Sequence, residues 1–136
     1  HALDEKGRLA LPKKFRSLLE GGVVVTKGLD NCLFLYTHKE WESLAQKLAA
    51  LPFAQGNARA FSRLMLAGAM DMELDKQGRV GLPEYLRQFA GLTKDVVVAG
   101  LYNRLELWDA AQWAAYKART EAESGDIAER MSALGV

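Results

Sequence analysis

A sixteen-residue stretch near the start of the chain has a similar counterpart in the second half. This internal repeat constrains the fold more than any other feature. The stretch LDEKGRLALPKKFRSL at residues 3–18 aligns with LDKQGRVGLPEYLRQF at residues 74–89, and seven of the paired positions are identical. Average residue usage gives roughly one chance identity in a window of this length. The chain therefore contains an internal duplication, and its two halves should fold alike.

Each copy predicts a tight β-hairpin turn, a return strand and a short helix. In the shared pattern Asp-x-x-Gly-Arg, Gly7 and Gly78 supply the left-handed backbone conformation that a tight turn needs. The return strands at residues 8–11 and 79–82 end at a proline, which cannot donate to a β-ladder but fits the first turn of a helix. A short amphipathic helix should follow in each copy.

The likeness continues for about forty residues per copy. Apolar runs at residues 23–26 and 96–99 lead through a turn to second strands at residues 32–36 and 104–108. A polar capping residue then opens a helix in each copy. Each unit should be β-β-α-β-β-α, which places the chain in the α+β class.

These units divide the chain into four segments. Residues 70–74 alternate in polarity and predict the strand that enters the second hairpin. The matching strand of the first copy would lie upstream of Leu3, and we expect a few native N-terminal residues to be missing. The segments are a first repeat at residues 1–52, a connecting helix at 53–68, a second repeat at 69–118 and a C-terminal helical tail at 119–136.

The composition is that of an ordinary globular protein. Hydrophobic residues make up 49% and charged residues 26%, and no apolar run approaches the roughly 20 residues that span a bilayer. We therefore expect a soluble protein without a membrane partner. The single cysteine, Cys32, permits no internal disulfide and lies in an apolar run, which indicates a small buried hydrophobe and suits a cytoplasmic location.

The chain contains few of the residue types that enzymes use for catalysis. Two histidines, His1 and His38, and one cysteine supply neither a metal-ligand cluster nor a nucleophile with its base. No glycine-rich phosphate loop or dinucleotide fingerprint occurs. We predict no catalytic site, metal, cofactor or small-molecule substrate, and an enzyme of unrecognised type remains only as an alternative.

Charge is distributed unevenly although the net charge is only +1. Residues 1–68 hold ten Lys and Arg against six Asp and Glu, and residues 69–136 hold eight against eleven. The first repeat therefore carries the basic face. The second is less basic because Gln77 stands where the first has Lys6.

The paired aspartate and arginine of each turn allow two interpretations. Asp4 and Arg8 flank one turn, so their side chains can meet as a clamp that only stabilises the turn. Alternatively, the aspartate holds the guanidinium in a position to contact a phosphate or a guanine edge. Lys6 at the tip would meet phosphate as a mobile charge.

The second interpretation predicts a set of DNA-contacting residues on both hairpins and the helices that follow. Lys14 belongs to the same basic helix as Lys13 and Arg16, although charged helical residues are commonly a solvated face. Asp4, Asp75, Gly7 and Gly78 would be structural partners of the binding arginines. The predicted contacts are Lys6, Arg8, Lys13, Arg16, Lys76, Arg79 and Arg87.

The pattern Asp-x-x-Gly-Arg-x-x-x-Pro-x-x-x-Arg resembles the swapped-hairpin DNA-binding fold of the AbrB and SpoVT type. Further motifs are Lys-Gly-Arg in the first copy, the turn Gly-Leu-Asp-x-Cys-Leu, and Gly-Leu-Thr-Lys-Asp-Val followed by Glu-Leu-Trp-Asp. With two copies in one chain, these motifs resemble the MraZ family over nearly the whole length. The family's usual beginning, Met-Phe-x-Gly, is absent here.

The resemblance implies a pseudo-symmetric swapped-hairpin domain of two intertwined, double-ψ-like half-barrels with flanking helices. It also implies a nucleoid-associated transcriptional regulator that binds short direct repeats in the promoter of the division and cell-wall gene cluster. The partners would be double-stranded DNA and further copies of the chain, closed into a ring of eight or more. The alternative from another class is an oligomeric scaffold that binds an acidic protein through the same hairpins.

Overall fold

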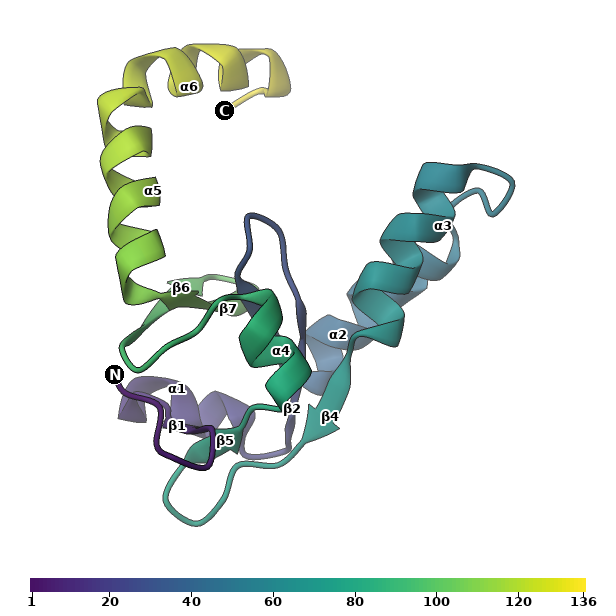
Figure 1. The fold of residues 1–136 in the computed structure, drawn as a ribbon. Helices are drawn as coiled ribbons and strands as arrows, with labels where there is room; N and C mark the ends of the chain where they lie inside the picture. Colours follow the sequence, from purple (N-terminus) through teal and green to yellow (C-terminus); the bar gives the residue numbers. More distant parts are fainter.

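The computed structural model describes all 136 residues and shows a mixed α+β fold, as the sequence predicts (Figure 1). Its main sheet is antiparallel, with the strand order β4-β2-β3-β7-β6. These strands are β4 (Met70–Met72), β2 (Val23–Lys27), β3 (Leu33–Tyr36), β7 (Arg104–Asp109) and β6 (Val96–Leu101). A separate two-stranded sheet joins β1 (Arg8–Ala10) to β5 (Arg79–Gly81).

Strands pair between the repeats as well as within them. Leu9 of β1 lies opposite Val80 of β5, and β3 of the first repeat pairs with β7 of the second. A bridge between Ala2 and Asp95 joins the start of the chain to the second repeat. Because each repeat supplies strands to the other, the two halves form one folding unit.

One predicted pairing is different in the structure. The strand expected over residues 70–74 is confirmed at Met70–Met72, but it pairs with β2 of the first repeat and not with β5. In these pairings β4 lies beside Val23 and Val25 of β2, which are both 0% exposed, and β5 lies beside β1, where Val80 is also 0% exposed. A hairpin confined to one repeat would leave that side chain less covered.

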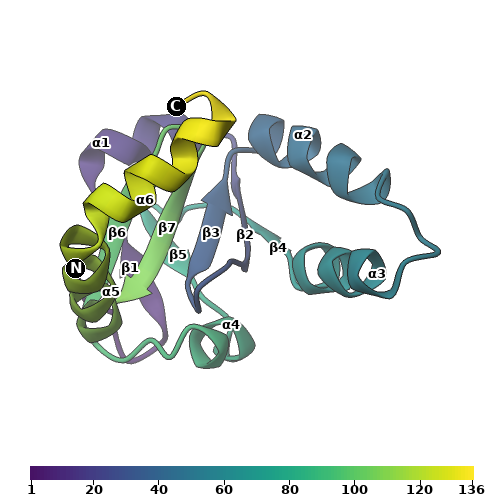
Figure 2. The ribbon, with the colours of Figure 1, turned by 90° about the horizontal axis from the view of Figure 1, so that it is seen from above.

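Two short helices follow β1 and β5, and two longer helical arms extend from the sheet (Figure 2). The short ones are α1 (Lys13–Arg16), which continues as the 3₁₀-helix η1 (Ser17–Leu19), and α4 (Glu84–Phe89). One arm contains α2 (His38–Ala49), α3 (Gly56–Ser62) and the π-helix η2 (Arg63–Ala67). The other contains α5 (Ala110–Ala122), α6 (Ser124–Met131) and the 3₁₀-helix η3 (Ser132–Leu134).

Local chemistry sets the helix boundaries. Thr37 and Asp109 cap α2 and α5, because their side-chain oxygens accept the backbone N–H groups of Glu40 and Gln112. The connecting helix predicted at residues 53–68 is present as α3, which continues directly as the π-helix η2. There the hydroxyl of Thr26 donates to the carbonyl of residue 65 at 2.6 Å, and a side chain inserted in this way can disrupt a helical hydrogen-bond ladder.

The sheet separates two apolar clusters. Alternate residues of β3 point to opposite faces, so that Leu33 and Leu35 join one cluster and Phe34 and Tyr36 join the other. The larger cluster lies between the main sheet and the β1–β5 pair, and both repeats contribute to it. The smaller one is covered by the helical arms. None of the helices combines the length and the apolar composition that a membrane span needs.

Cys32 is buried, as predicted, with 0% exposure. Its thiol donates to the carbonyl oxygen of Leu29 at 3.1 Å. Burial raises the pKa of this thiol to about 12, so that it stays protonated at neutral pH.

Candidate nucleic-acid interface

The first Asp-x-x-Gly-Arg turn is organised by Asp4. One carboxylate oxygen accepts the backbone N–H groups of Lys6 at 2.9 Å and Arg8 at 2.8 Å, and the other accepts the Nε–H of Arg8 at 2.6 Å. Gly7 has φ = +75°, as the turn requires. The backbone N–H of Arg8, followed by its side chain, holds the pKa of Asp4 below its ordinary value. The predicted ion pair is confirmed.

The second turn repeats this geometry. Asp75 accepts the backbone N–H groups of Gln77 and Arg79, both at 2.9 Å, and the Nε–H of Arg79 at 2.7 Å. Gly78 has φ = +73°. Again the backbone N–H of the arginine is the largest cause of a lowered aspartate pKa. The two similar sequences therefore form the same arrangement of aspartate, glycine and arginine in both turns.

Both arginines remain accessible. The side chains of Arg8 and Arg79 are 35% and 25% exposed. Only the Nε–H of each is used in a hydrogen bond, and the terminal Nη groups donate to no protein acceptor. Each guanidinium is thus hydrogen-bonded at one edge, and its Nη groups keep their hydrogen-bond donors for bidentate contact with an anion.

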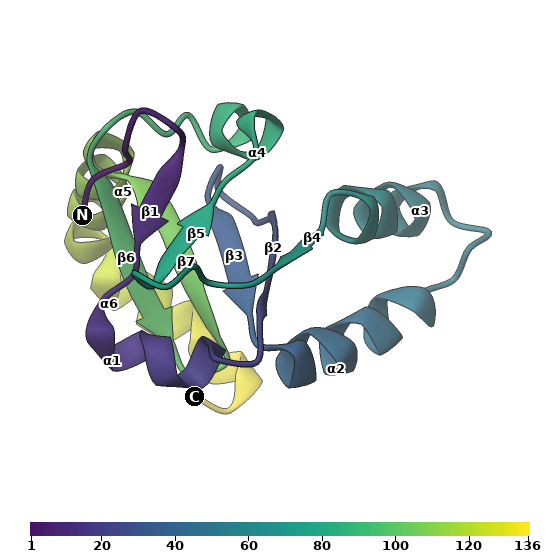
Figure 3. The same ribbon diagram turned by 90° about the horizontal axis from the view of Figure 1, so that it is seen from below.

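Pairing of β1 with β5 brings the two constellations together. Nη1 of Arg79 lies 3.7 Å from Oδ2 of Asp4, so an ion pair crosses from one repeat to the other. Figure 3 shows β1 and β5 side by side, with α1 and α4 on opposite sides of the pair. Sequence reasoning treated the two turns as separate sites and did not predict this contact.

Arg16 and Arg87 are placed differently from the other predicted contacts. Each donates its Nε–H to a backbone carbonyl of its own repeat, Leu11 at 2.8 Å and Leu82 at 3.1 Å. Both side chains are half-buried. The Nε–H groups of both arginines are therefore already used within the protein.

Each of these arginines also lies on the turn of the opposite repeat. A methyl group at Gly78 would be 2.8 Å from Cζ of Arg16, and one at Gly7 would be 2.8 Å from Cζ of Arg87. Glycine is thus required at both turns for close approach as well as for its backbone conformation. Sequence reasoning missed this packing because the partners are about sixty to eighty residues apart.

The lysines are the exposed positive charges of this surface. Lys6 and Lys76 at the turn tips and Lys13 and Lys14 on α1 are all exposed. Position 84 of α4, which matches Lys13, holds a glutamate. The surface beside α1 is therefore more basic than the surface beside α4.

The acidic, histidine and cysteine side chains are the candidate ligands for a metal site. No group of three or more His, Cys, Asp and Glu side chains is arranged to hold a metal ion. His38 makes an exposed contact, with Nε2 2.8 Å from Oδ1 of Asp71, which connects α2 to β4. This exposed pair joins α2 to β4 at the surface.

Comparison with known proteins gives one consistent result. The family model described as "MraZ protein, putative antitoxin-like" matches residues 1–64 and again residues 65–134. The chain is 46% identical over 136 residues to a protein of Acetivibrio thermocellus named "Transcriptional regulator MraZ", covering 100% of the chain and 95% of the relative.

Two further relatives carry the same name. The protein of Natranaerobius thermophilus is 48% identical over 96% of the chain and 92% of its own length. That of Desulfitobacterium hafniense is 48% identical over 100% of the chain and 95% of its own length. The likeness therefore extends over both repeats and nearly the full length of the relatives.

Proposed function

The chain belongs to the MraZ family, and on this basis we propose that it is a sequence-specific, DNA-binding transcriptional regulator. The family consists of transcriptional regulators and not of enzymes. The predicted absence of a catalytic site agrees with this membership.

The observation that supports DNA binding best is the cluster of two aspartate–arginine pairs on the β1–β5 face. Arg8 and Arg79 present Nη groups that donate no hydrogen bond within the protein, and each arginine is held in place by the aspartate of its own turn, with Nη1 of Arg79 also 3.7 Å from Asp4. A guanidinium held in this way can donate two parallel hydrogen bonds to a guanine edge or a phosphate. Lys6 and Lys76 would neutralise phosphates at either side.

In this proposal the Nη groups of Arg16 and Arg87 also contact DNA, while their Nε–H groups donate to the carbonyl oxygens of Leu11 and Leu82. Lys13 on α1 would extend the basic surface toward the DNA backbone. The more basic first repeat should therefore contribute more to binding than the second.

The finer parts of the proposal follow the family. The target would be short direct repeats in the promoter of the division and cell-wall gene cluster, and the protein would act in the cytoplasm at the nucleoid. Copies of the chain would close into a ring of eight or more, so that several β1–β5 faces meet successive repeats. Avidity would then give tight binding without any single tight contact.

The test is fluorescence anisotropy with labelled promoter duplex at increasing salt. Wild-type protein should show a steep fall of log K with log salt, because several phosphates are engaged. Arg8→Ala should abolish specific binding, Arg79→Ala should weaken it less, and Lys6→Ala should mainly reduce the salt slope. Arg119→Ala, an exposed arginine on α5, is the matched control and should leave affinity unchanged.

Two outcomes would contradict the assignment. Unchanged promoter affinity in the double variant Arg8→Ala with Arg79→Ala would show that these two arginines do not form the DNA-binding site. Failure of the wild-type protein to bind the duplex even at low salt would contradict the proposed DNA binding. It would favour the scaffold alternative, in which the same hairpins bind an acidic protein.

A further inference from the structure

The two helical arms each leave an apolar surface uncovered. The arm of α2, α3 and η2 and the arm of α5 and α6 extend from the sheet in different directions (Figures 1 and 2). The hydroxyl of Ser62 donates to the carbonyl of Leu48 at 3.2 Å and thereby connects α3 to α2. The first arm is therefore a defined pair of helices with a surface between them.

That surface is a groove. It encloses about 260 Å³. Phe53, at the connection between α2 and α3, is 85% exposed, which is unusual for a large apolar side chain beside other apolar groups. The groove is lined by Leu48, Ala49, Leu51, Phe53, Ala58, Arg59, Ser62, Arg63 and Leu66.

The second surface is one face of α6 and its extension. Ile127, Met131 and Leu134 recur at the spacing of a helix face and are 38%, 40% and 73% exposed. All residues from 121 to 136 are exposed. A helix of eight residues gains little stability in water by itself, so packing of this apolar face against a partner would stabilise α6.

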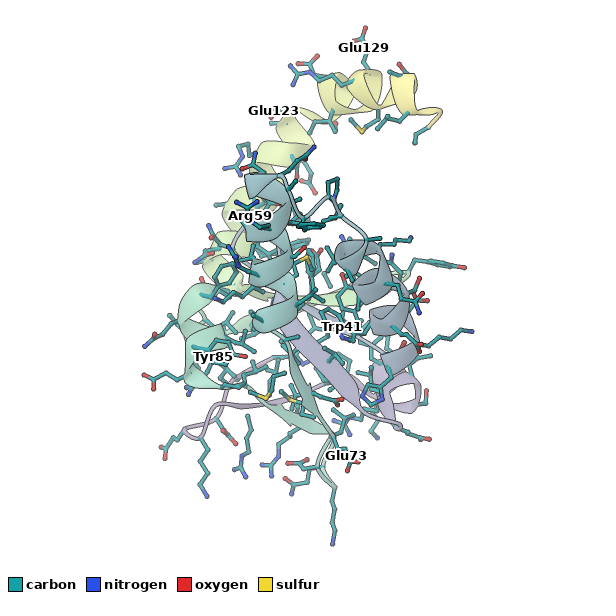
Figure 4. The ribbon with its side chains drawn as sticks, turned by 90° about the vertical axis from the view of Figure 1, so that its right-hand side faces the viewer. Trp41, Arg59, Glu73, Tyr85, Glu123 and Glu129 are labelled. Carbon is teal, nitrogen blue, oxygen red and sulfur yellow. The ribbon has the colours of Figure 1, made fainter.

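The two surfaces carry opposite charges. Arg59 and Arg63 lie in the groove, form no ion pair and have no carboxylate among the other lining residues. Residues 124–134 hold two carboxylates, those of Asp126 and Glu129, and one arginine, and two further carboxylates, those of Glu121 and Glu123, directly precede them. Figure 4 shows Arg59 on the first arm and Glu123 and Glu129 on the C-terminal arm.

We propose that the α6 segment of one copy, residues 124–134, docks into the α2–α3 groove of a second copy. Ile127 and Met131 would cover Leu51 and Phe53, and the carboxylates would face Arg59 and Arg63. The two surfaces differ and lie on separate arms, so the contact is head-to-tail; each added copy offers a further groove and a further α6 segment, and the chain of copies closes into a ring where the rotation allows. The inference rests on the proposed function only in that this contact would join the copies of the proposed ring.

The contact can be tested on full-length chains by native mass spectrometry in the absence of DNA. A groove variant, Phe53→Asp with Arg63→Glu, and a helix variant, Ile127→Asp with Met131→Asp, alter only exposed or partly exposed positions. Wild-type protein should assemble beyond the dimer, and each variant alone should give the 15.0 kDa monomer.

Mixing the two variants gives the decisive measurement. The groove variant keeps an intact α6 and the helix variant keeps an intact groove, so the mixture should form a one-to-one dimer and stop there. The control is Leu18→Asp with Tyr102→Asp, which alters the other exposed apolar surface and should leave assembly unchanged.

Several results would overturn the inference: a monomeric wild type at tens of micromolar, assembly that persists in either variant, a mixture that stays monomeric, or loss of assembly in the control. None of these depends on DNA. Arg8→Ala with Arg79→Ala should assemble normally, so a failure of DNA binding and a failure of docking are distinguished.

Discussion

Replacing Gly78 with alanine should lower the free energy of unfolding by about 2–4 kcal/mol, which is large for the addition of one methyl group at a turn. Two costs combine there. At φ = +73° an L-residue is less favourable than glycine by about 1–2 kcal/mol. The new methyl would also lie 2.8 Å from Cζ of Arg16, so that side chain would have to move.

The second cost can be estimated from what holds Arg16. Its Nε–H donates to the carbonyl of Leu11 at 2.8 Å, and a net hydrogen bond of this kind contributes about 1 kcal/mol when partly exposed. In an Arg16→Ala background the clash is gone and only the backbone cost remains. The double-mutant cycle should therefore show a coupling of about 1–2 kcal/mol between residues 16 and 78.

Urea unfolding followed by tryptophan fluorescence measures the cycle, at one protein concentration because assembly would add to apparent stability. Gly81→Ala is the matched control, since Gly81 has no positive φ and no atom within 4 Å of the added methyl. It should change stability by no more than about 0.5 kcal/mol. Additive costs for Arg16→Ala and Gly78→Ala would refute the packing of Arg16 on the opposite turn.

Three further predictions concern other parts of the molecule. The lowered pKa values of Asp4 and Asp75 contribute stability that is complete above the unfolded value of 3.8 and is lost as pH falls through the folded values. Urea titrations below pH 4 should therefore show a smaller loss for the double asparagine variant than for wild type. Cys32, with a pKa of about 12, has roughly one thiolate in ten thousand at pH 8, and Ellman's reagent should modify it only after unfolding. Thr26→Val leaves a π-helix carbonyl without its donor and should cost about 1–3 kcal/mol by urea unfolding, whereas Thr120→Val on α5 should cost less than about 0.5 kcal/mol.

Much of the fold follows from local chemistry and was predictable from the sequence. The turn needs a left-handed glycine, and Asp4 and Arg8 are near enough in the chain to pair in almost any context that forms the turn. Thr37 caps α2 because its hydroxyl is three residues from the N–H group it accepts. Duplication then predicts the same elements in the second half, which the structure confirms for the second turn and for α5.

The arrangement of the candidate site was decided only by tertiary structure. Two nearly identical turn-and-strand units could pair within a repeat or between repeats, and the local pattern is the same in both cases. Pairing between repeats buries Leu9 and Val80 completely in a core that both halves share. That burial brings Arg79 to Asp4 and sets Arg16 on the turn at Gly78. The amino-acid order alone determined which side chains the site contains, and long-range burial of apolar surface determined how they meet, because hydrophobic free energy depends on the whole core and not on neighbours in the chain.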